Sequence, residues 1–224
     1  MERKDIWKAK EVLRDMSWEQ RIDYIWSYFG VYIIIGTVCL AVLISILATV
    51  FRPQKEVLLS GVSVNVTLTE EGERYLSDKL FAPMGGTDAE QQMVEFTPRF
   101  LGSKEDYEGY SAQVMGMVAL VAAQSLDYAI LDKEALEQFA GGQMFDDLRN
   151  LLTAEQIAAL EGKLITMEYE EVGAIPVAID ISDLPFIKEC APGEKTAFIA
   201  FPGNTPRTEK LVAFFDHLLS WQGK

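Results

Sequence analysis

Residues 31–51 read VYIIIGTVCLAVLISILATVF, a run of 21 residues without a charged side chain. A helix rises about 1.5 Å per residue, so this length just spans a hydrocarbon core of roughly 30 Å. A helix also pairs every backbone N–H and C=O within the segment, as the bilayer requires. The run therefore predicts one transmembrane helix. It separates residues 1–30 from a domain at residues 57–224, with a linker at 52–56.

Basic side chains are distributed unevenly about this run. Six Lys and Arg precede it, whereas only Arg52 and Lys55 follow closely. Because Lys/Arg bias sets orientation, we predict residues 1–30 in the cytoplasm and residues 57–224 outside the cell membrane of a bacterial envelope. A cleaved signal peptide would have a shorter apolar core of about 7–15 residues and a small-residue cleavage site. We therefore interpret the run as an uncleaved signal anchor.

The segment before the run leaves two interpretations open. Apolar residues recur among charges in residues 1–16, which fits an interfacial amphipathic helix and a solvated tail equally well. Ser17 and Gln20 have the spacing of a capping box, which predicts a helix beginning there and running into the membrane. Tyr24 and Trp26 lie just before the run, where aromatic rings prefer the headgroup level.

The predicted outer domain is acidic. The whole chain has 34 Asp and Glu against 20 Lys and Arg, and from residue 52 onward 28 acids face 14 bases. Nucleic-acid binding needs basic patches, so we expect no nucleic-acid partner. The same charge opposes docking flat on an anionic bilayer. Cys39 lies in the apolar run and Cys190 far beyond it, so the two cannot form a disulfide with each other.

Strand-like and helix-like patterns alternate along residues 57–224, which predicts an α/β fold with a parallel or mixed sheet flanked by helices. The apolar composition of residues 110–125 predicts a helix without a solvent-exposed face. The expected strands are 57–68, 92–100, 126–131, 173–181 and 195–201, and the expected helices are 72–81, 110–125, 133–140, 145–152, 154–164 and 208–221.

No catalytic, cofactor or metal-binding motif stands out in the sequence. It has no Gly-x-Ser-x-Gly, no Gly-x4-Gly-Lys, no His-Glu-x-x-His and no Cys-x-x-Cys. The only histidine, His217, falls opposite the apolar stripe of the last expected helix, so we expect it to be solvated. The acidic clusters at 146–147 and 168–171 lack the spaced ligands of a calcium loop. We therefore expect no enzyme activity, no cofactor and no metal.

Open α/β sheets bind ligands beyond the carboxyl ends of their strands. Applied to the expected strands, this rule selects a set of polar residues as a candidate ligand site. Ordinary turn and capping chemistry favours the same residue types, so both interpretations stay open. The candidates are Ser103, Asp132, Ser182, Asp183 and Asn204.

Two stretches resemble the extracellular solute-binding proteins of ABC importers. Residues 113–152 contain Leu126-Asp127-Tyr128 and Asp147-Leu148, which match a helix–strand–helix segment of that family. Residues 175–186, IPVAIDISDLPF, resemble the strand by which such chains return to their first lobe, and Trp221 resembles the family's closing helix. The resemblance implies a periplasmic-binding-protein-like domain with a single lobe.

Members of that family have two lobes and roughly twice this length, and most are secreted or lipid-anchored. The resemblance therefore implies a reduced, membrane-tethered relative that binds without catalysis. Its partner would be a small-molecule ligand, or a membrane transporter to which it is accessory. The alternative is a structural or regulatory accessory subunit of an envelope complex that contacts protein only.

The apolar run contains a stripe of small residues spaced by four. Thr37, Ala41, Ser45 and Thr49 lie on one helix face, where small side chains permit close approach of another helix. The hypothesis is that this stripe docks a second transmembrane helix. A chance spacing of common residues is the alternative.

The Lys/Arg bias makes a direct prediction about topology. Protease added outside intact spheroplasts should remove the chain beyond about Lys55, because the acidic domain is exposed there. Immunoblotting with antibodies against each end measures this. Protection of residues 57–224 in intact spheroplasts, with digestion only after lysis, would reverse the predicted orientation.

Overall fold

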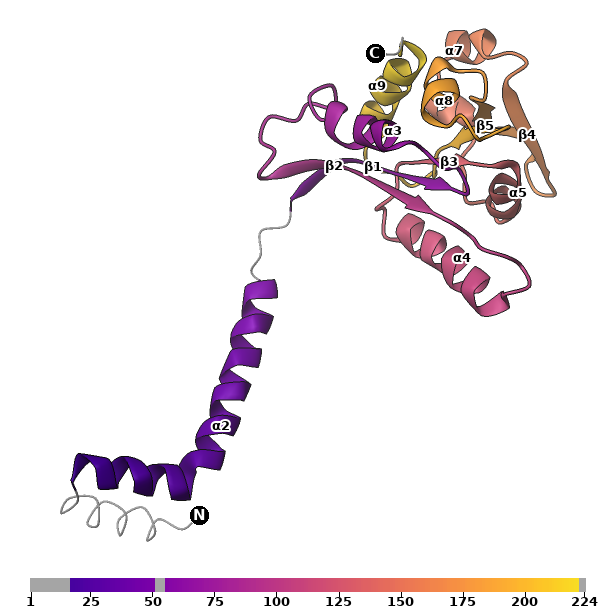
Figure 1. Cartoon of the computed structure of the whole chain (residues 1–224). Coiled ribbons are helices and arrows are strands. Elements are labelled where there is room, and N and C mark those ends of the chain that lie inside the picture. Colours follow the sequence, from indigo (N-terminus) through magenta and orange to yellow (C-terminus); the bar gives the residue numbers. More distant parts are fainter. Residues whose placement is uncertain (1–16, 51–54, 222–224) are drawn as a thin grey trace. The chain divides into compact units, whose positions relative to one another are not determined.

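The computed structural model describes residues 17–50 and 55–221 (Figure 1). The chain divides into two compact units, Met1–Gln54 and Lys55–Lys224. The two interpretations of residues 1–16 fall outside the described residues, as does most of the expected linker.

The first unit is one long helix, α2 (Trp18–Val50), which begins directly after the expected cap at Ser17. Within it, Gly30–Leu47 has a mean hydropathy of 2.6 and is long and apolar enough to cross a membrane as an anchor or a signal sequence. Of these eighteen residues only Gly30 is buried, unlike the core helix of a soluble protein. The Thr37 hydroxyl donates to the Ile33 carbonyl at 2.9 Å, so this polar group is satisfied within the helix.

The second unit is built on one six-stranded mixed sheet in the order β2-β1-β3-β6-β5-β4. β1 (Glu56–Val64) pairs in parallel with both β2 (Gln92–Arg99) and β3 (Tyr128–Leu131). β6 (Phe198–Ala200) is antiparallel to β3, and β5 (Gly173–Asp180) is antiparallel to β6. β4 (Leu164–Tyr169) closes the far edge, antiparallel to β5. The predicted α/β class with a mixed sheet flanked by helices is confirmed.

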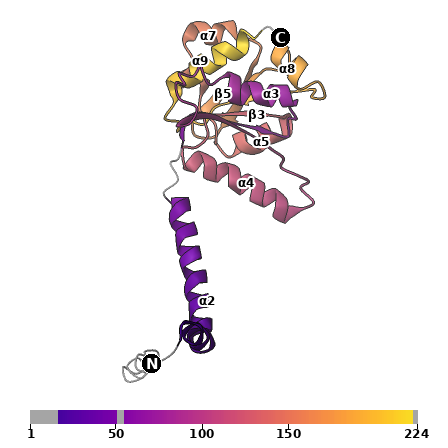
Figure 2. The same cartoon turned by 60° about the vertical axis from the view of Figure 1, so that its left-hand side comes forward.

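Helices cover both faces of the sheet (Figures 1 and 2). α3 (Glu70–Arg74) and the π-helix η1 (Tyr75–Lys79) connect β1 to β2, and α4 (Tyr107–Ala122) connects β2 to β3. The first connection steps from β1 to β2, and the second steps back in the opposite direction from β2, past β1, to β3. Right-handed crossovers in opposite directions place their helices on opposite faces. The other helices are α5 (Lys133–Gly141), α6 (Leu148–Leu151), α7 (Ala154–Ala159), α8 (Pro185–Cys190) and α9 (Thr208–Leu219).

Each face has its own hydrophobic core. On the side of α3, α8 and α9, the buried side chains include Leu76, Phe186 and Phe214. On the side of α4 and α5, they include Met117 and Phe139. All four residues of β3 are buried, as the continuous apolar run of residues 126–131 predicted.

Three expectations about local structure are wrong. The helix expected at 154–164 ends at Ala159, and the residues from Leu164 to Tyr169 form the edge strand β4. Pairing with β5 decides this strand, and a tertiary contact of that kind overrides local propensity. The helix expected at 145–152 is limited to α6, and α8 was not expected.

The expectation that residues 110–125 have no exposed face is also wrong. Only Met117 of α4 is buried, whereas Met115 is 73% and Val118 50% exposed. α4 lies outside the sheet as an outer layer, and no described element covers its far side (Figure 1). The apolar composition of this helix therefore does not correspond to burial.

A close contact between β1 and β3 fixes the centre of the sheet. Gly61 lies opposite Tyr128, and a Cβ on Gly61 would come within 2.0 Å of Cζ of the Tyr128 ring. The ring thus occupies the space that any other residue at position 61 would fill. On its other side it stacks on Phe214 of α9, with the ring centroids 4.1 Å apart. Burial raises the pKa of the Tyr128 hydroxyl well above its ordinary value, and this hydroxyl has no hydrogen-bond partner among the described residues.

We expect Gly61→Ala to lower the free energy of unfolding by about 1–3 kcal/mol, because the added methyl group overpacks the core. Gly141→Ala is the matched control, since nothing lies within 4 Å of a Cβ at this last residue of α5. Chemical denaturation of the detergent-solubilised chain, followed by near-ultraviolet circular dichroism, measures both. Equal unfolding midpoints for the two variants would contradict the packing argument.

Candidate functional site

Several strands finish at the same end of the sheet, because they run in the same direction. The parallel strands β1, β2 and β3 end there, and so does β5, because two antiparallel steps restore the direction of β3. The antiparallel strand β6 begins at the same edge. Open α/β sheets bind ligands beyond the carboxyl ends of their strands. We call this end of the sheet, where β1, β2, β3 and β5 finish, the carboxyl edge. It is the first place to look for a site.

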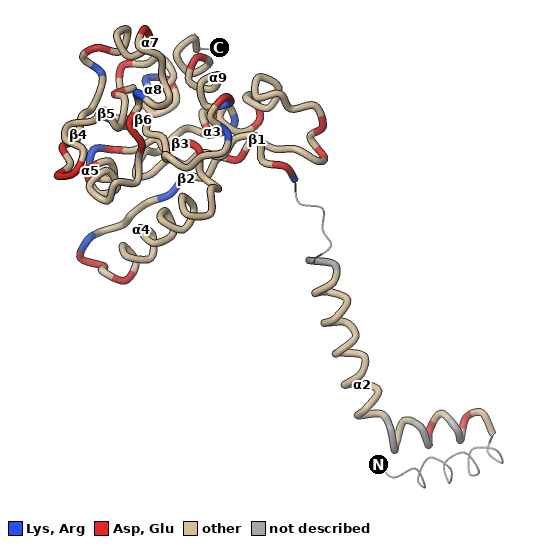
Figure 3. The backbone as a smooth tube through the Cα atoms, turned by 180° about the vertical axis from the view of Figure 1, so that it is seen from behind, with Lys and Arg blue, Asp and Glu red and all other residues tan. Residues whose placement is uncertain are grey.

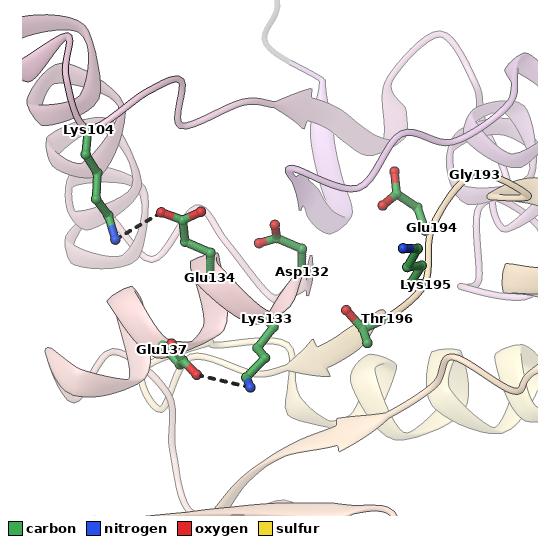
Figure 4. Close-up of a pocket in the computed structure, with 9 residues that line it drawn as sticks. All are labelled: Lys104, Asp132, Lys133, Glu134, Glu137, Gly193, Glu194, Lys195 and Thr196. Carbon is green, nitrogen blue, oxygen red and sulfur yellow. Dashed lines mark ion pairs between the residues drawn. The ribbon is translucent and has the colours of Figure 1, made fainter.

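A hollow of about 690 Å³ lies at this edge (Figure 4). Its walls come from the loop before α4, from the first turns of α5 and from the loop that leads into β6. Charged side chains dominate the lining, and none of the lining residues is aromatic. They are Lys104, Asp132, Lys133, Glu134, Glu137, Gly193, Glu194, Lys195 and Thr196.

Asp132 forms the floor of the hollow, and Asn65, which does not line it, bonds to Asp132 between the ends of the parallel strands. The Asp132 carboxylate accepts from the backbone N–H of Ala135 at 2.8 Å and so caps α5. The Asn65 amide lies 3.4 Å from both Asp132 oxygens, and its own oxygen accepts from the Leu101 N–H at 2.9 Å. Asn65 has a φ of 57°, a left-handed conformation that Asn tolerates better than most residues. These bonds join the ends of β1, β2 and β3.

Two ion pairs and one further cation surround this floor (Figure 4). Lys104 pairs with Glu134 at 2.9 Å, and Lys133 approaches Glu137 at 3.9 Å. The hydrogen bond that Lys104 donates to Glu134, aided by the charge of the carboxylate, raises the pKa of Lys104 above its ordinary value. Lys195 forms no ion pair within the described part of the chain. Both charge signs are therefore presented to solvent at the hollow.

Glu194 links the hollow to the segment that follows β1. One of its carboxylate oxygens accepts from the Thr67 N–H at 2.9 Å. This bond holds the loop before β6 against the segment that follows β1. The carboxylate of Glu194 is therefore positioned by the fold at the rim of the hollow.

The structure brings together only part of the expected ligand site. Asp132 lines the hollow, and Ser103 precedes the lining residue Lys104, with its hydroxyl accepting from the Glu105 N–H at 3.1 Å. Ser182 follows β5 at the same edge, where its hydroxyl donates to Asp180 and accepts from the Ala197 N–H at 3.0 Å.

Neither of the other two expected residues lines the hollow. Asp183 is exposed and pairs with Lys188 at 2.9 Å, and this bond lowers the pKa of the Asp183 carboxyl. Asn204 follows β6, which runs antiparallel to β3, so it lies at the opposite edge of the sheet. There its amide donates to the Val121 carbonyl at 2.6 Å. Because the last strand is antiparallel, its carboxyl end lies away from that of β3, and Asn204 does not lie beside Asp132.

Most residues of the hollow gave no signal in the sequence. Lys104, Glu134, Lys195 and their neighbours belong to ordinary charged loops and helix starts, whose residue types are common everywhere on protein surfaces. Asn65 did offer a signal, because Asn after a β-branched run is typical of a turn. The strand expected at 57–68 included Asn65, so the turn at this residue was not predicted.

Neither a metal-binding cluster nor a buried histidine occurs among the described residues. No group of three or more His, Cys, Asp and Glu side chains in the described segments is placed to hold a metal ion. His217 is exposed on α9, as predicted.

A second hollow, of about 670 Å³, lies between η1 and the edge strand β2, with Phe81 and Phe96 among its lining residues.

A buried ion pair holds the opposite edge of the sheet. Asp127 is fully buried and accepts from the Ser60 N–H at 2.7 Å, from the Thr205 hydroxyl and from Nη1 of Arg207 at 3.2 Å. Arg207 also donates to the carbonyls of Val57 and Gln124. Every bond of this network joins described segments of the same domain, so its role is structural.

No family model, curated protein or solved structure matches this chain. The resemblance to solute-binding proteins therefore stays a prediction from the sequence.

We expect Arg207→Met to lower the free energy of unfolding by about 3–5 kcal/mol, because it leaves the buried Asp127 carboxylate without its cation. Arg74→Met is the matched control, since it removes an arginine from the solvent-exposed pair with Glu70. We expect that control to leave the unfolding midpoint nearly unchanged. Denaturant titration of both variants tests this, and similar losses would assign no special role to the buried pair.

Proposed function

We propose that this chain is a non-catalytic, single-pass membrane protein that holds a binding domain outside the cytoplasm. The apolar window of α2 supports the anchor, since only one of its eighteen residues is buried. The excess of Lys and Arg before that window supports a cytoplasmic N-terminus and a location in the cell membrane. The binding site is the hollow at the carboxyl edge of β1 and β3.

One observation carries the binding function, namely the concentration of ionic groups in that hollow. Three ammonium groups and four carboxylates line it, at the edge where open α/β sheets bind ligands. Lys195 has no carboxylate partner among the described residues, and Asp132 and Glu194 are held by backbone hydrogen bonds. Such a surface fits a partner that itself presents both charge signs, because complementary charges give specificity and steer association.

The shape of the hollow favours a protein as that partner. A pocket that captures a small solute buries about 70–90% of the ligand surface. In the described part of the domain a single sheet and its loops form the hollow, without a second lobe over it. A small ligand would therefore stay largely solvated. This supports a solute-binding-protein-like domain acting as an accessory to a transporter or another envelope complex, ahead of capture of a free solute.

Site-specific photo-crosslinking in the cells that make the protein tests this proposal. The full chain carries benzoylphenylalanine in place of Thr196 in the hollow, or in place of the exposed Glu161 as the control. We expect Thr196 to give a discrete protein adduct that the control lacks, identified by mass spectrometry. Lys195→Glu should weaken this adduct, whereas Lys163→Glu, also exposed, should not.

The outcomes separate the two functions. A protein adduct that depends on Lys195 supports the accessory role. A small molecule that co-purifies with the wild-type chain and is lost with Lys195→Glu assigns the hollow to solute binding. No adduct and no co-purifying molecule would reject the hollow as a binding site.

A further inference from the structure

The outward face of α4 is an apolar surface that no described element covers. Six of its residues are exposed, and Met115 and Val118 keep 73% and 50% of their surface. No charged residue occurs between Glu108 and Asp127, so α4 is uncharged beyond its first turn (Figure 3). Exposed apolar patches of this kind mark contact sites. The six residues are Ala112, Met115, Val118, Ala119 and Ala122 of α4, and Ala123, which directly follows the helix.

The orientation of this face is fixed by the contacts of the opposite side of the helix. Met117 is 1% exposed and packs in the core between α4 and the sheet. The Tyr110 hydroxyl donates to Gln138 of α5 at 2.9 Å, and Asn204 donates to the Val121 carbonyl at 2.6 Å. Rotating α4 to bury Met115 would break all three contacts. The apolar face is therefore a stable surface of the folded domain.

An aromatic residue flanks this face at its beginning. Tyr107 is 76% exposed in the first turn of α4, and Met115, Val118 and Ala122 follow it on the same side at helical spacing. Aromatic rings prefer the headgroup level of a membrane, so Tyr107 suits a position at that depth.

The end of α4 lies next to the point where the chain enters the domain. Arg207 donates to the carbonyl of Val57, near the start of β1, at 3.2 Å, and to the carbonyl of Gln124, just after α4, at 3.4 Å. One guanidinium thus bridges the two segments. α2 ends at Val50 and β1 begins at Glu56, so five residues connect them. Fully extended, such a connection reaches only about 18 Å.

From these observations we propose that the outward face of α4 inserts into the lipid headgroup region of the bilayer that anchors the chain. The proposal rests on the proposed function, because it needs α2 to cross that bilayer. A tether of about 18 Å is shorter than α4 itself, whose sixteen residues extend about 24 Å. The tether is therefore short enough for the face to reach the membrane surface, and burying it there removes apolar area from water.

The charge of the domain selects the kind of lipid. Residues 55–224 hold 28 Asp and Glu against 13 Lys and Arg, so an anionic surface repels the domain as a whole. The α4 face has no charge beyond Glu108 and meets no such repulsion. Contact is therefore with zwitterionic lipid, driven by apolar insertion, and it should not weaken as salt increases.

Spin labelling of the full chain in phosphatidylcholine vesicles tests this inference. Nitroxides are attached at Met115→Cys and Ala119→Cys in a Cys39→Ala background, in which Cys190 is buried and 2% exposed. Glu155→Cys on α7 is the aqueous control, and the native Cys39 labelled alone reports on the span. We expect positions 115 and 119 to collide with oxygen as lipid-exposed sites do and to be shielded from a water-soluble nickel chelate.

Two double variants test whether the apolar face itself causes the shielding at position 115. Val118→Glu with Ala122→Glu should return the label at position 115 to the nickel accessibility of position 155, because two carboxylates oppose insertion. Val118→Leu with Ala122→Leu keeps the face apolar and should leave the shielding unchanged. Both positions are exposed, so both pairs should fold, and circular dichroism checks this.

Three results would overturn the inference. Nickel accessibility at 115 and 119 equal to that at 155, with Cys39 in the bilayer, would reject membrane contact while the anchor stands. Shielding of 115 and 119 from both oxygen and nickel would show that a second copy of the chain covers the face. A label at Cys39 that is accessible to nickel would remove the anchor, and with it both the inference and the proposed topology.

Discussion

The buried carboxylate of Asp127 is the interaction on which the arrangement of the domain depends. It receives hydrogen bonds from β1 through Ser60 and from the segment before α9 through Thr205 and Arg207. A buried charge is tolerated only when it is paired and hydrogen-bonded, so these segments must meet at one point for the domain to fold. Arg207 extends the network to Val57 and Gln124. The start of β1, the end of α4 and the start of α9 are thereby held together.

The two ends of the sheet differ, because the Asp127 network occupies one end and the charged hollow the other. The edge with Asp127 is where the chain enters the domain, and the uncharged face of α4 ends beside it. The carboxyl edge, with Asp132 and Asn65, lies at the other end of β1, a strand of nine residues that extends about 30 Å. The charged hollow is thus as far from the tether as the sheet allows. A domain built in this way can rest on lipid through one surface and still present the other to a partner.

Two contacts hold β1 between its neighbours β2 and β3. Gly61 makes room for the Tyr128 ring, which then stacks on Phe214 of α9. This packing joins β1, β3 and the last helix across one face of the sheet. Asn65, in a left-handed conformation, joins the same strands to the end of β2 at the carboxyl edge. β1 is therefore fixed to its neighbours on one face and at its carboxyl end by particular side chains.

The sequence by itself determined which segments are apolar, where most helices and strands lie, and that the domain is α/β with an acidic surface. These features depend on local composition and periodicity, which are complete in the sequence. It also identified Asp132, because a polar residue directly after a buried strand marks the carboxyl edge. Only the tertiary structure decided that β6 is antiparallel, that residues 164–169 pair as an edge strand, and that one face of α4 is left uncovered. Strand direction and the covering of a helix depend on partners far away in the chain, and an apolar residue has the same local pattern whether protein or lipid buries it.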